Sequence, residues 1–392
     1  MKKYDFDTPI ERRGTGCVKY DMLGDLYGRT DLLPMWVADM DFRSPDFVVD
    51  ALKKRLDHDV LGYAMAERSY YDAVLSWLGK RYGVDAQRSD VHFIPGIVAG
   101  IAYTLLAFTE PGDKVLVTTP VYPPFLHLPA DNGRVLECSP LLLRDGRFEI
   151  DFDDFERRAR ECKLCIMSNP HNPAGTVWSK DDLQRVSAIC KKHGVLVVSD
   201  EIHADLVLPG HRHTSFSTVG SDALDNSITF IAPSKTFNIA GLGSSVCYIG
   251  NESIRKRFFG WLDGLGVAGG NIFAFIGAAA AYSEGEEWLA QMVDYLAGNV
   301  DFLRRVVAER LPKAKAVLPE SSYLAWLDFG GYGLTHKELA ALFVNEARVA
   351  LNDGTSFGGD AFQGWFRMNI GCPRSMVGEC VNRIADALAR TC

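Results

Sequence analysis

Lys235 follows an apolar run and a proline, at a place where an amine can do chemistry. Residues 228–231 predict a buried strand that ends at Pro233. The lysine is flanked by the hydroxyls of Ser234 and Thr236. This setting favours a partly dry pocket, in which a lysine amine loses its proton and becomes a nucleophile. From this stretch alone, a surface lysine in a loop is the alternative.

A carboxylate lies just beyond another predicted strand. The continuous apolar run 195–198 is typical of a central strand in a parallel sheet, and Asp200 follows it within Ser-Asp-Glu-Ile-His. An ionised carboxylate is costly to bury unless it faces a cation or a protonated heterocycle. Asp200 therefore requires a positive partner.

Two further strand exits carry side chains suited to a flat aromatic ligand. The predicted strand 164–167 runs into Ser-Asn-Pro-His-Asn-Pro-Ala-Gly, a turn-rich loop that holds Asn172 between a histidine and a proline. The predicted strand 114–119 ends in Pro-Val-Tyr-Pro-Pro, where the prolines fix the backbone of Tyr122. A rigid tyrosine suits stacking on a flat ring, with simple packing as the alternative.

A glycine turn could supply an anion site. Residues 91–94 predict a short strand that ends in Pro95-Gly96, and a largely buried helix follows. The first amides of such a helix are free to bind a phosphate, with help from the helix dipole. Neither the dinucleotide fingerprint GxGxxG nor the Walker loop GxxxxGK[ST] occurs here.

The elements that must position these side chains alternate between strand and helix. This alternation predicts a mostly parallel α/β sheet with its ligand site at the carboxyl edge of the strands. Pro45 marks the start of a helix, and a further helix is expected over 181–192. The last third of the chain predicts helices over 286–310 and 334–344 and edge-strand material over 317–327. The glycine-rich stretch 351–359 is expected to close over the site, with a plain linker as the alternative.

Composition excludes several classes of protein. The chain has 392 residues, of which 47% are hydrophobic and 23% charged, and its net charge of −8 argues against nucleic acid or an anionic membrane as the main partner. Met1-Lys2-Lys3 leads into Tyr-Asp-Phe-Asp, so no apolar core follows the two lysines as a secretory signal would require, and no apolar run is long enough to span a bilayer; we therefore expect a cytoplasmic protein. Nine scattered cysteines fit reduced thiols, and the pair Cys162 and Cys165 makes a poor metal site, so no metal is expected.

The side chains above occur together in an order that resembles a known superfamily. Tyr122, Asn172, Asp200 and Lys235, in their local motifs, resemble the fold-type I pyridoxal-phosphate enzymes of the class I/II aminotransferase superfamily. The pieces LPMWVADMDF, LGYAMAERSYYDAV, TPVYPPF and SKTFNIAGL are most similar to the cystathionine β-lyase group of the MalY/PatB type. The resemblance covers nearly the whole chain. It implies an aspartate aminotransferase-like α/β fold, with a large domain (46–285) built on a mostly parallel seven-stranded sheet. A smaller α+β domain would comprise 1–45 and 286–392.

The resemblance also implies roles for single residues. Lys235 would hold pyridoxal phosphate as an imine and would move the substrate's Cα proton. Asp200 would pair with the protonated pyridine nitrogen, so that the ring stays an electron sink. Asn172 would donate to the phenolic oxygen of the ring, and Tyr122 would stack on its face.

Further residues would bind the phosphate and the substrate. Arg367 would grip the substrate carboxylate as a bidentate fork, near Ala38. Tyr63 would reach the phosphate from the neighbouring subunit of a homodimer. The phosphate itself would lie on backbone amides and one hydroxyl, at Gly96, Ile97, Val98 and Ser234.

Two positions depart from the classical aminotransferase pattern. Aminotransferases place a phosphate-binding arginine shortly after the lysine, where this chain has Gly243. Many of them also place a tyrosine, which bonds the phenolic oxygen of the ring, where this chain has His203. His203 is expected to bind the cofactor or to pack beside it. Both departures fit the lyase-like group.

The expected activity follows from the chemistry of the leaving group. Once the Cα proton is removed, a thiolate on Cβ can leave, because thiols ionise near pH 8.5. We therefore expect a carbon–sulfur β-lyase that acts on L-cystathionine or cysteine S-conjugates in methionine biosynthesis. An aminotransferase is the alternative. A non-enzymatic regulator is disfavoured, because the key residues are present and no DNA-binding segment precedes them.

Overall fold

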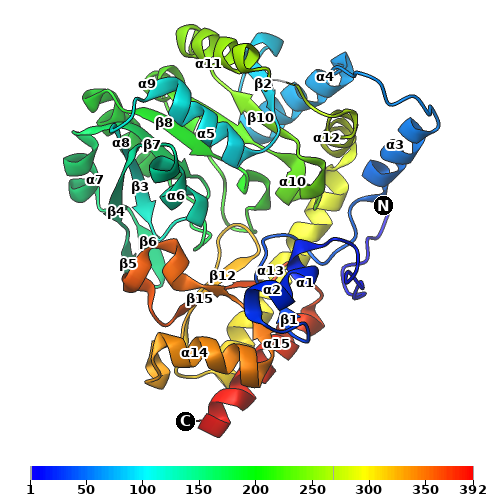
Figure 1. Ribbon diagram of the computed structural model, residues 1–392, viewed down its shortest axis with the longest axis vertical. Helices are drawn as coiled ribbons and strands as arrows, with labels where there is room; N and C mark the ends of the chain where they lie inside the picture. The colour runs from blue at the N-terminus through cyan, green and yellow to red at the C-terminus, as the bar shows by residue number, and fades with distance from the viewer. Residues whose placement is uncertain (1, 268, 392) are drawn as a thin grey trace.

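The core of the fold is a seven-stranded sheet with the order β2-β10-β9-β8-β7-β3-β4 (Figure 1). The computed structural model describes residues 2–267 and 269–391. Six of these seven strands point the same way, and β10 points the opposite way between β2 and β9, which confirms the mostly parallel sheet that the sequence predicts. The strands are β2 (Val91–Ile94), β3 (Lys114–Thr119), β4 (Val135–Pro140), β7 (Cys162–Ser168), β8 (Leu196–Asp200), β9 (Ser227–Ile231) and β10 (Ser245–Tyr248).

Alternating side chains direct β3 toward two different helix layers. Val115 and Val117 pack in one apolar cluster with α5, α6 and α11, whereas Leu116 packs in a second cluster with α7 and α8. This alternation is the period-two pattern of a strand that is buried on both faces. The helices of the two layers are α5 (Ile97–Phe108), α6 (Pro123–Asp131) and α11 (Glu252–Leu265), and α7 (Phe152–Ala159), α8 (Lys180–His193) and α9 (Ser221–Asp225).

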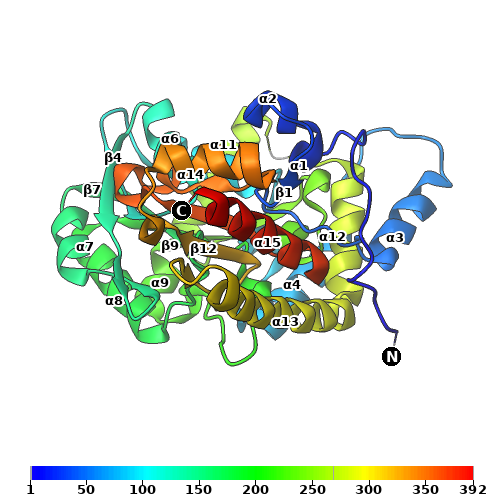
Figure 2. The ribbon, with the colours of Figure 1, turned by 90° about the horizontal axis from the view of Figure 1, so that it is seen from below.

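The C-terminal part forms a second, four-stranded sheet with the order β11-β12-β15-β14. Its strands are antiparallel, and α13 and α15 lie side by side over it (Figure 2). The elements are β11 (Lys315–Val317), β12 (Leu324–Asp328), β14 (Asn352–Asp353), β15 (Trp365–Asn369), α13 (Glu286–Arg310), α14 (His336–Leu342) and α15 (Arg374–Thr391).

The expected edge strand over 317–327 is wrong in two respects. The stretch divides into β11 and β12, and β12 lies inside the small sheet between β11 and β15. The residues between the strands leave the sheet because Pro319 cannot donate to a ladder and Ser322 takes a left-handed φ of 78°. This irregular link turns out to reach the candidate site.

The N-terminal segment contacts both the C-terminal part of the chain and α12 before the first strand of the large sheet begins. Strand β1 (Leu33–Pro34) pairs in parallel with β13 (Val349–Ala350), and α12 packs against α3 and α4. The link between α3 and α4 projects from the molecule (Figure 1). The remaining α-helices and strands are α1 (Val18–Asp21), α2 (Leu23–Tyr27), α3 (Asp46–Leu56), α4 (Arg68–Trp77), α10 (Pro233–Thr236), α12 (Ile272–Glu284) and the hairpin of β5 (Leu142–Arg144) and β6 (Arg147–Glu149). The domain boundaries expected from the sequence stay a prediction.

Candidate active site

The strand exits singled out in the sequence meet at one cavity of about 210 Å³. It lies at the carboxyl ends of β8 and β9 and at the start of α5, which is the edge that the sequence predicts. Most of the predicted site residues line it. They are Ala38, Gly96, Ile97, Val98, Tyr122, Asn172, Asp200, His203, Ser234 and Lys235.

Lys235 lies on α10, the single helical turn that follows β9. Its Nζ donates a hydrogen bond to the Ala38 carbonyl oxygen at 2.6 Å. Burial lowers the pKa of the amine from 10.5 to about 8, against the opposing effect of the nearby Asp39 carboxylate. An appreciable fraction of this amine is therefore neutral near pH 8, as a nucleophile or a base requires.

Asp200 is the last residue of β8 and is almost fully buried, with 5% of its surface exposed. One carboxylate oxygen, Oδ1, accepts a hydrogen bond from the backbone amide of Ile202 at 3.0 Å. Burial nevertheless raises the pKa of the carboxyl to about 7. The protein's own groups thus leave Asp200 short of positive charge, which suits a protonated ring nitrogen as its partner.

Arg367 lies on β15, behind Asn172, and is 4% exposed. Its Nη1 donates to Asn172 Oδ1 at 3.1 Å, and its Nη2 donates to Asn352 Oδ1 at 2.6 Å. Burial lowers its pKa to about 10. The buried Nε has no partner among the described residues. These neutral partners orient the guanidinium without cancelling its charge, so the site can still attract a carboxylate.

The start of α5 and the segment before β10 form the opposite wall. Ser244 and Ser245 line the cavity beside the predicted amides of Ile97 and Val98. Gly243 has a φ of +59°, and a Cβ there would lie 3.3 Å from the Pro95 carbonyl oxygen. A side chain such as arginine would be strained at this position. On this wall the chain therefore presents backbone amides and serine hydroxyls.

His203 and Tyr122 both line the cavity. His203 is buried, and its surroundings, first burial and then the charges of Lys235 and Arg367, lower its pKa to about 3. Its Nδ1 has no hydrogen-bond partner within the described part of the chain. Tyr122 is half-buried at the start of α6, and burial raises the pKa of its hydroxyl. A neutral imidazole and a protonated phenol thus face the ligand space.

Tyr63 does not reach this cavity in a single chain. It lies in the link between α3 and α4, with its side chain fully exposed. Its role across a subunit interface stays a prediction, as do the roles of the other site residues.

Sequence reasoning missed several residues that hold the site together. Tyr323 comes from the irregular link before β12, and its hydroxyl donates to the Ala38 carbonyl oxygen at 3.1 Å. Asn369 bonds the backbone on both sides of Ala38. A signal existed for Asn369, because residues two apart on a strand share a face and Arg367 precedes it by two. Tyr323 and Asn352 carry no such signal, since their contacts depend on how the small sheet meets the large one.

The residues present fit pyridoxal phosphate. The cavity offers a lysine amine of lowered pKa, a buried carboxyl that requires a cation, and helix-start amides with hydroxyls for a phosphate. For metals the result is different. No group of three or more histidine, cysteine or acidic side chains that could hold an ion occurs in residues 2–267 and 269–391. Within the same residues, no helix is both long and apolar enough to cross a membrane.

Comparison with known proteins identifies the family. The model of the family "Aminotransferase class I and II" matches residues 30–384, so this chain belongs to that family. The chain is similar to cystathionine β-lyase PatB of Bacillus subtilis (strain 168), with 44% identity over 387 residues, 98% of this chain and 100% of the relative. It is also similar to protein MalY of Escherichia coli (strain K12), with 30% identity over 392 residues, 98% of this chain and 99% of the relative. The resemblance stated from the sequence motifs is confirmed.

Solved structures show the same fold over the whole chain. Cystalysin from Treponema denticola, which contains a pyridoxal 5′-phosphate cofactor, matches with a TM-score of 0.96 and 34% identity, and the match covers 100% of both chains. The PLP-bound C–S lyase from Staphylococcus hominis matches with a TM-score of 0.91 and 36% identity, over 99% of this chain and 98% of the other. A PLP-bound putative aminotransferase from Clostridium difficile 630 reaches a TM-score of 0.96 at 37% identity, over 98% and 100%. The predicted PLP-dependent transferase fold is confirmed.

Proposed function

We propose that this protein is a pyridoxal-phosphate-dependent carbon–sulfur β-lyase. It cleaves L-cystathionine or related cysteine S-conjugates to a thiol, pyruvate and ammonia. The observation that carries the proposal is the cavity that joins the lowered-pKa amine of Lys235 to the buried carboxyl of Asp200, with Arg367 behind it. The names of relatives such as PatB and the C–S lyase support the choice of reaction.

Bound pyridoxal phosphate supplies an electron sink that makes the Cα proton of an amino acid acidic. Lys235 would hold the cofactor and then serve as the base, because a neutral amine is accessible near its pKa of about 8. Asp200 would pair with the protonated ring nitrogen and so keep that nitrogen charged. Asn172 would contact the phenolic oxygen, and Tyr122 would lie against the ring.

Substrate binding would depend on Arg367 and its neighbours. Asn172 and Asn352 each hold one terminal nitrogen of the guanidinium, so the fork is oriented before the substrate arrives. The α-carboxylate of an amino acid would lie against this fork, near Ala38. A thiol ionises near pH 8.5, so a thiolate is a stable leaving group and the Cβ–S bond would break without a strong acid at the sulfur.

An aminotransferase is the second candidate, favoured by the name of the family and by the Clostridium difficile structure. The two are separated by incubating purified protein with L-cystathionine and no keto acid, while pyruvate and free thiol are followed together. We expect equal release of both, abolished in Lys235→Ala and retained in Lys163→Ala, which removes an exposed lysine on β7. Turnover of amino acids only after addition of 2-oxoglutarate or pyruvate would refute the lyase assignment and support the aminotransferase assignment.

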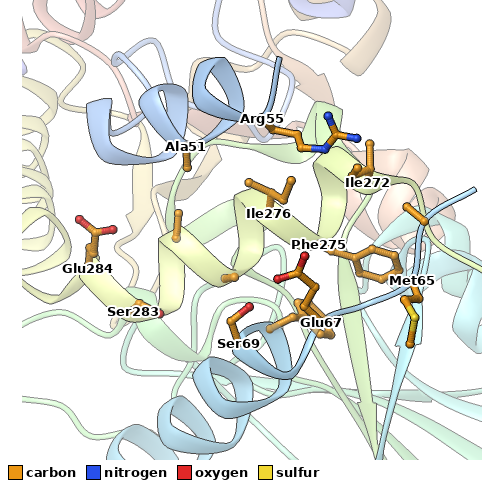
Figure 3. A pocket seen from close by; sticks show the side chains of 14 residues that line it. Ala51, Arg55, Met65, Glu67, Ser69, Ile272, Phe275, Ile276, Ser283 and Glu284 are labelled. Atoms are coloured by element: carbon orange, nitrogen blue, oxygen red, sulfur yellow. The ribbon is translucent and has the colours of Figure 1, made fainter. Parts of the chain in front are cut away.

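The protein is also proposed to act as a homodimer. Exposed apolar side chains gather at the end of α3 and in the link after it, beside a cavity of about 490 Å³ that Figure 3 shows between α3, the start of α4 and α12. A patch of this kind on one face favours an interface, and the partner that fits is a second copy, whose cofactor phosphate Tyr63 would reach. The exposed side chains are Leu56, Val60, Leu61, Tyr63 and Met65.

Mixing two inactive variants tests this arrangement. Tyr63→Ala supplies an intact Lys235, and Lys235→Ala supplies an intact Tyr63. If the tyrosine acts across the interface, randomly reassorted dimers regain about one quarter of the wild-type sites. Lyase activity should therefore return on mixing after mild unfolding and refolding together. No recovery, with dimers still present by light scattering, would place Tyr63 outside the partner's site.

The cellular setting follows from the proposed reaction. Cleavage of L-cystathionine between Cβ and sulfur yields homocysteine, so we assign the enzyme to methionine biosynthesis in the cytoplasm. Growth of a homocysteine-requiring strain on cystathionine, dependent on this protein and lost with Lys235→Ala, tests that assignment.

A further inference from the structure

The backbone around Ala38 is held by side chains on both sides of the Ala38 carbonyl. Residues 36–40 run past Lys235, and each of the other carbonyls in this stretch accepts a hydrogen bond from a side chain. The donors are Arg367 to Trp36 (3.2 Å), Asn369 to Val37 (2.5 Å) and to Asp39 (2.6 Å), and Asn238 to Met40 (2.8 Å).

The Ala38 carbonyl oxygen itself accepts hydrogen bonds from two donors. Lys235 Nζ donates to it at 2.6 Å and Tyr323 Oη at 3.1 Å. A carbonyl oxygen has two lone pairs, so it can accept both bonds at once. Tyr323 is fully buried, with no exposed surface, and its ring lies edge-on to His203 at 6.4 Å.

The link that carries Tyr323 is itself fixed in an unusual conformation. Ser322 has a φ of 78°, which a non-glycine residue adopts only when its surroundings impose it. On one side, the Ser321 hydroxyl donates to the His203 carbonyl oxygen at 3.0 Å, and on the other, the amide of Ile370 donates to the Tyr323 carbonyl oxygen at 2.7 Å. These two hydrogen bonds attach the small sheet to the cavity wall on either side of Tyr323.

We propose that Tyr323 and Asn369 are positioning residues that hold the Ala38 carbonyl as a fixed hydrogen-bond acceptor for the Lys235 amine. The inference rests on the proposed role of Lys235 as the base of the lyase reaction. A carbonyl accepts hydrogen bonds and cannot donate them, so it stabilises the ammonium form of lysine over the neutral amine. Each time Lys235 takes up a proton, that ammonium has a partner whose place is already set.

The pH dependence of Lys235 labelling tests this role without any lyase activity. The full chain, prepared without cofactor, is reacted briefly with an amine-specific reagent at pH 6 to 10, and modification at Lys235 is quantified by mass spectrometry. Only the neutral amine reacts, so the midpoint reports the pKa. In Tyr323→Phe the carbonyl loses its second donor and its alignment, and we expect the midpoint to fall by about 0.5 to 1 pH unit.

Matched variants separate positioning from packing. Tyr282→Phe removes another buried tyrosine hydroxyl, one with no hydrogen-bond partner in the described chain, and should leave the midpoint unchanged. Asn369→Ala should lower the midpoint as Tyr323→Phe does. Its control is Asn226→Ala, which removes an asparagine that donates to the Val195 backbone carbonyl, away from the residues that line the cavity, and should leave the midpoint unchanged.

Two results would overturn the inference. An unchanged midpoint in folded Tyr323→Phe would show that Tyr323 only packs against its neighbours. A raised midpoint would show that Tyr323 competes with the lysine for the carbonyl. In the holoenzyme, Tyr323→Phe should lower kcat more than it raises KM. Failure of the wild-type protein to release pyruvate and thiol would refute the lyase proposal and leave the labelling result standing.

Discussion

Replacing Asp200 with asparagine would measure how far the buried, ionised carboxyl lowers the free energy of unfolding. Its pKa is raised from 3.8 to about 7 by burial, a difference of about 3 pH units. One pH unit corresponds to about 1.36 kcal/mol, so keeping this carboxyl ionised costs the folded protein about 4 kcal/mol when no ligand supplies a positive charge. The asparagine side chain has nearly the same shape as aspartate and carries no charge.

The sign of the effect sets its pH window. Between about pH 4 and pH 7 the folded state holds a proton on Asp200 that the unfolded state has released, so stability falls as the pH rises through this range. Above pH 7 both states are ionised and the full cost remains. In cofactor-free protein, Asp200→Asn should therefore match the wild type near pH 4 and exceed its stability by up to about 4 kcal/mol at pH 8.

Urea unfolding followed by fluorescence at pH 4 to 8, on both proteins without cofactor, measures this difference directly. The order should reverse once pyridoxal phosphate is added, because a protonated ring nitrogen stabilises the carboxylate and gains nothing from the amide. A stability difference that does not change with pH would refute the reasoning. So would an asparagine variant that binds the cofactor as tightly as the wild type.

Two further substitutions test the geometry of the site and of its support. Arg367→Lys keeps the positive charge but loses the planar fork held by Asn172, so KM for L-cystathionine should rise about tenfold or more while kcat changes less; equal losses in both would contradict a carboxylate-binding role. Gly175→Ala should lower the unfolding free energy by about 2 kcal/mol or more in urea titrations, because φ is +70° and the new Cβ would lie 2.5 Å from Pro319. Gly146→Ala shares the positive φ (+79°) but meets no atom within 4 Å, so it should cost clearly less, and equal costs would rule out the clash.

The large sheet could be predicted from the sequence because its signals are local. The strand predicted at 91–94 and the one at 114–119 have the bounds of β2 and β3, since prolines end both apolar runs. The helix predicted over 286–310 has the bounds of α13. Asp200 belongs to β8 itself, further along the strand than the apolar run indicates, because a strand continues while its ladder is paired.

The small unit was predicted less well because its contacts join distant segments. Pro319 and Ser322 break the run that composition alone extends to residue 327. Asn352 lies opposite Arg367 in the pairing of β14 with β15. These strands are short and show no periodic apolar pattern, so no local sequence pattern predicts this register. Tyr63 marks a different limit, since one sequence contains no direct signal of a second subunit.

The pKa values of three ionisable groups around the cavity are all shifted in the direction that favours the neutral form, and this common direction favours one kind of ligand. Burial lowers the pKa of Lys235 to about 8 and of Arg367 to about 10, and it raises that of Asp200 to about 7. A ligand with a ring cation at one end and a carboxylate at the other would relieve Asp200 and Arg367 together. The neutral His203 adds no charge between them, because its pKa is lowered to about 3. The protein has already met the desolvation cost of these groups during folding, so the charges of a cofactor and an amino acid would be stabilised there without reorganisation of water.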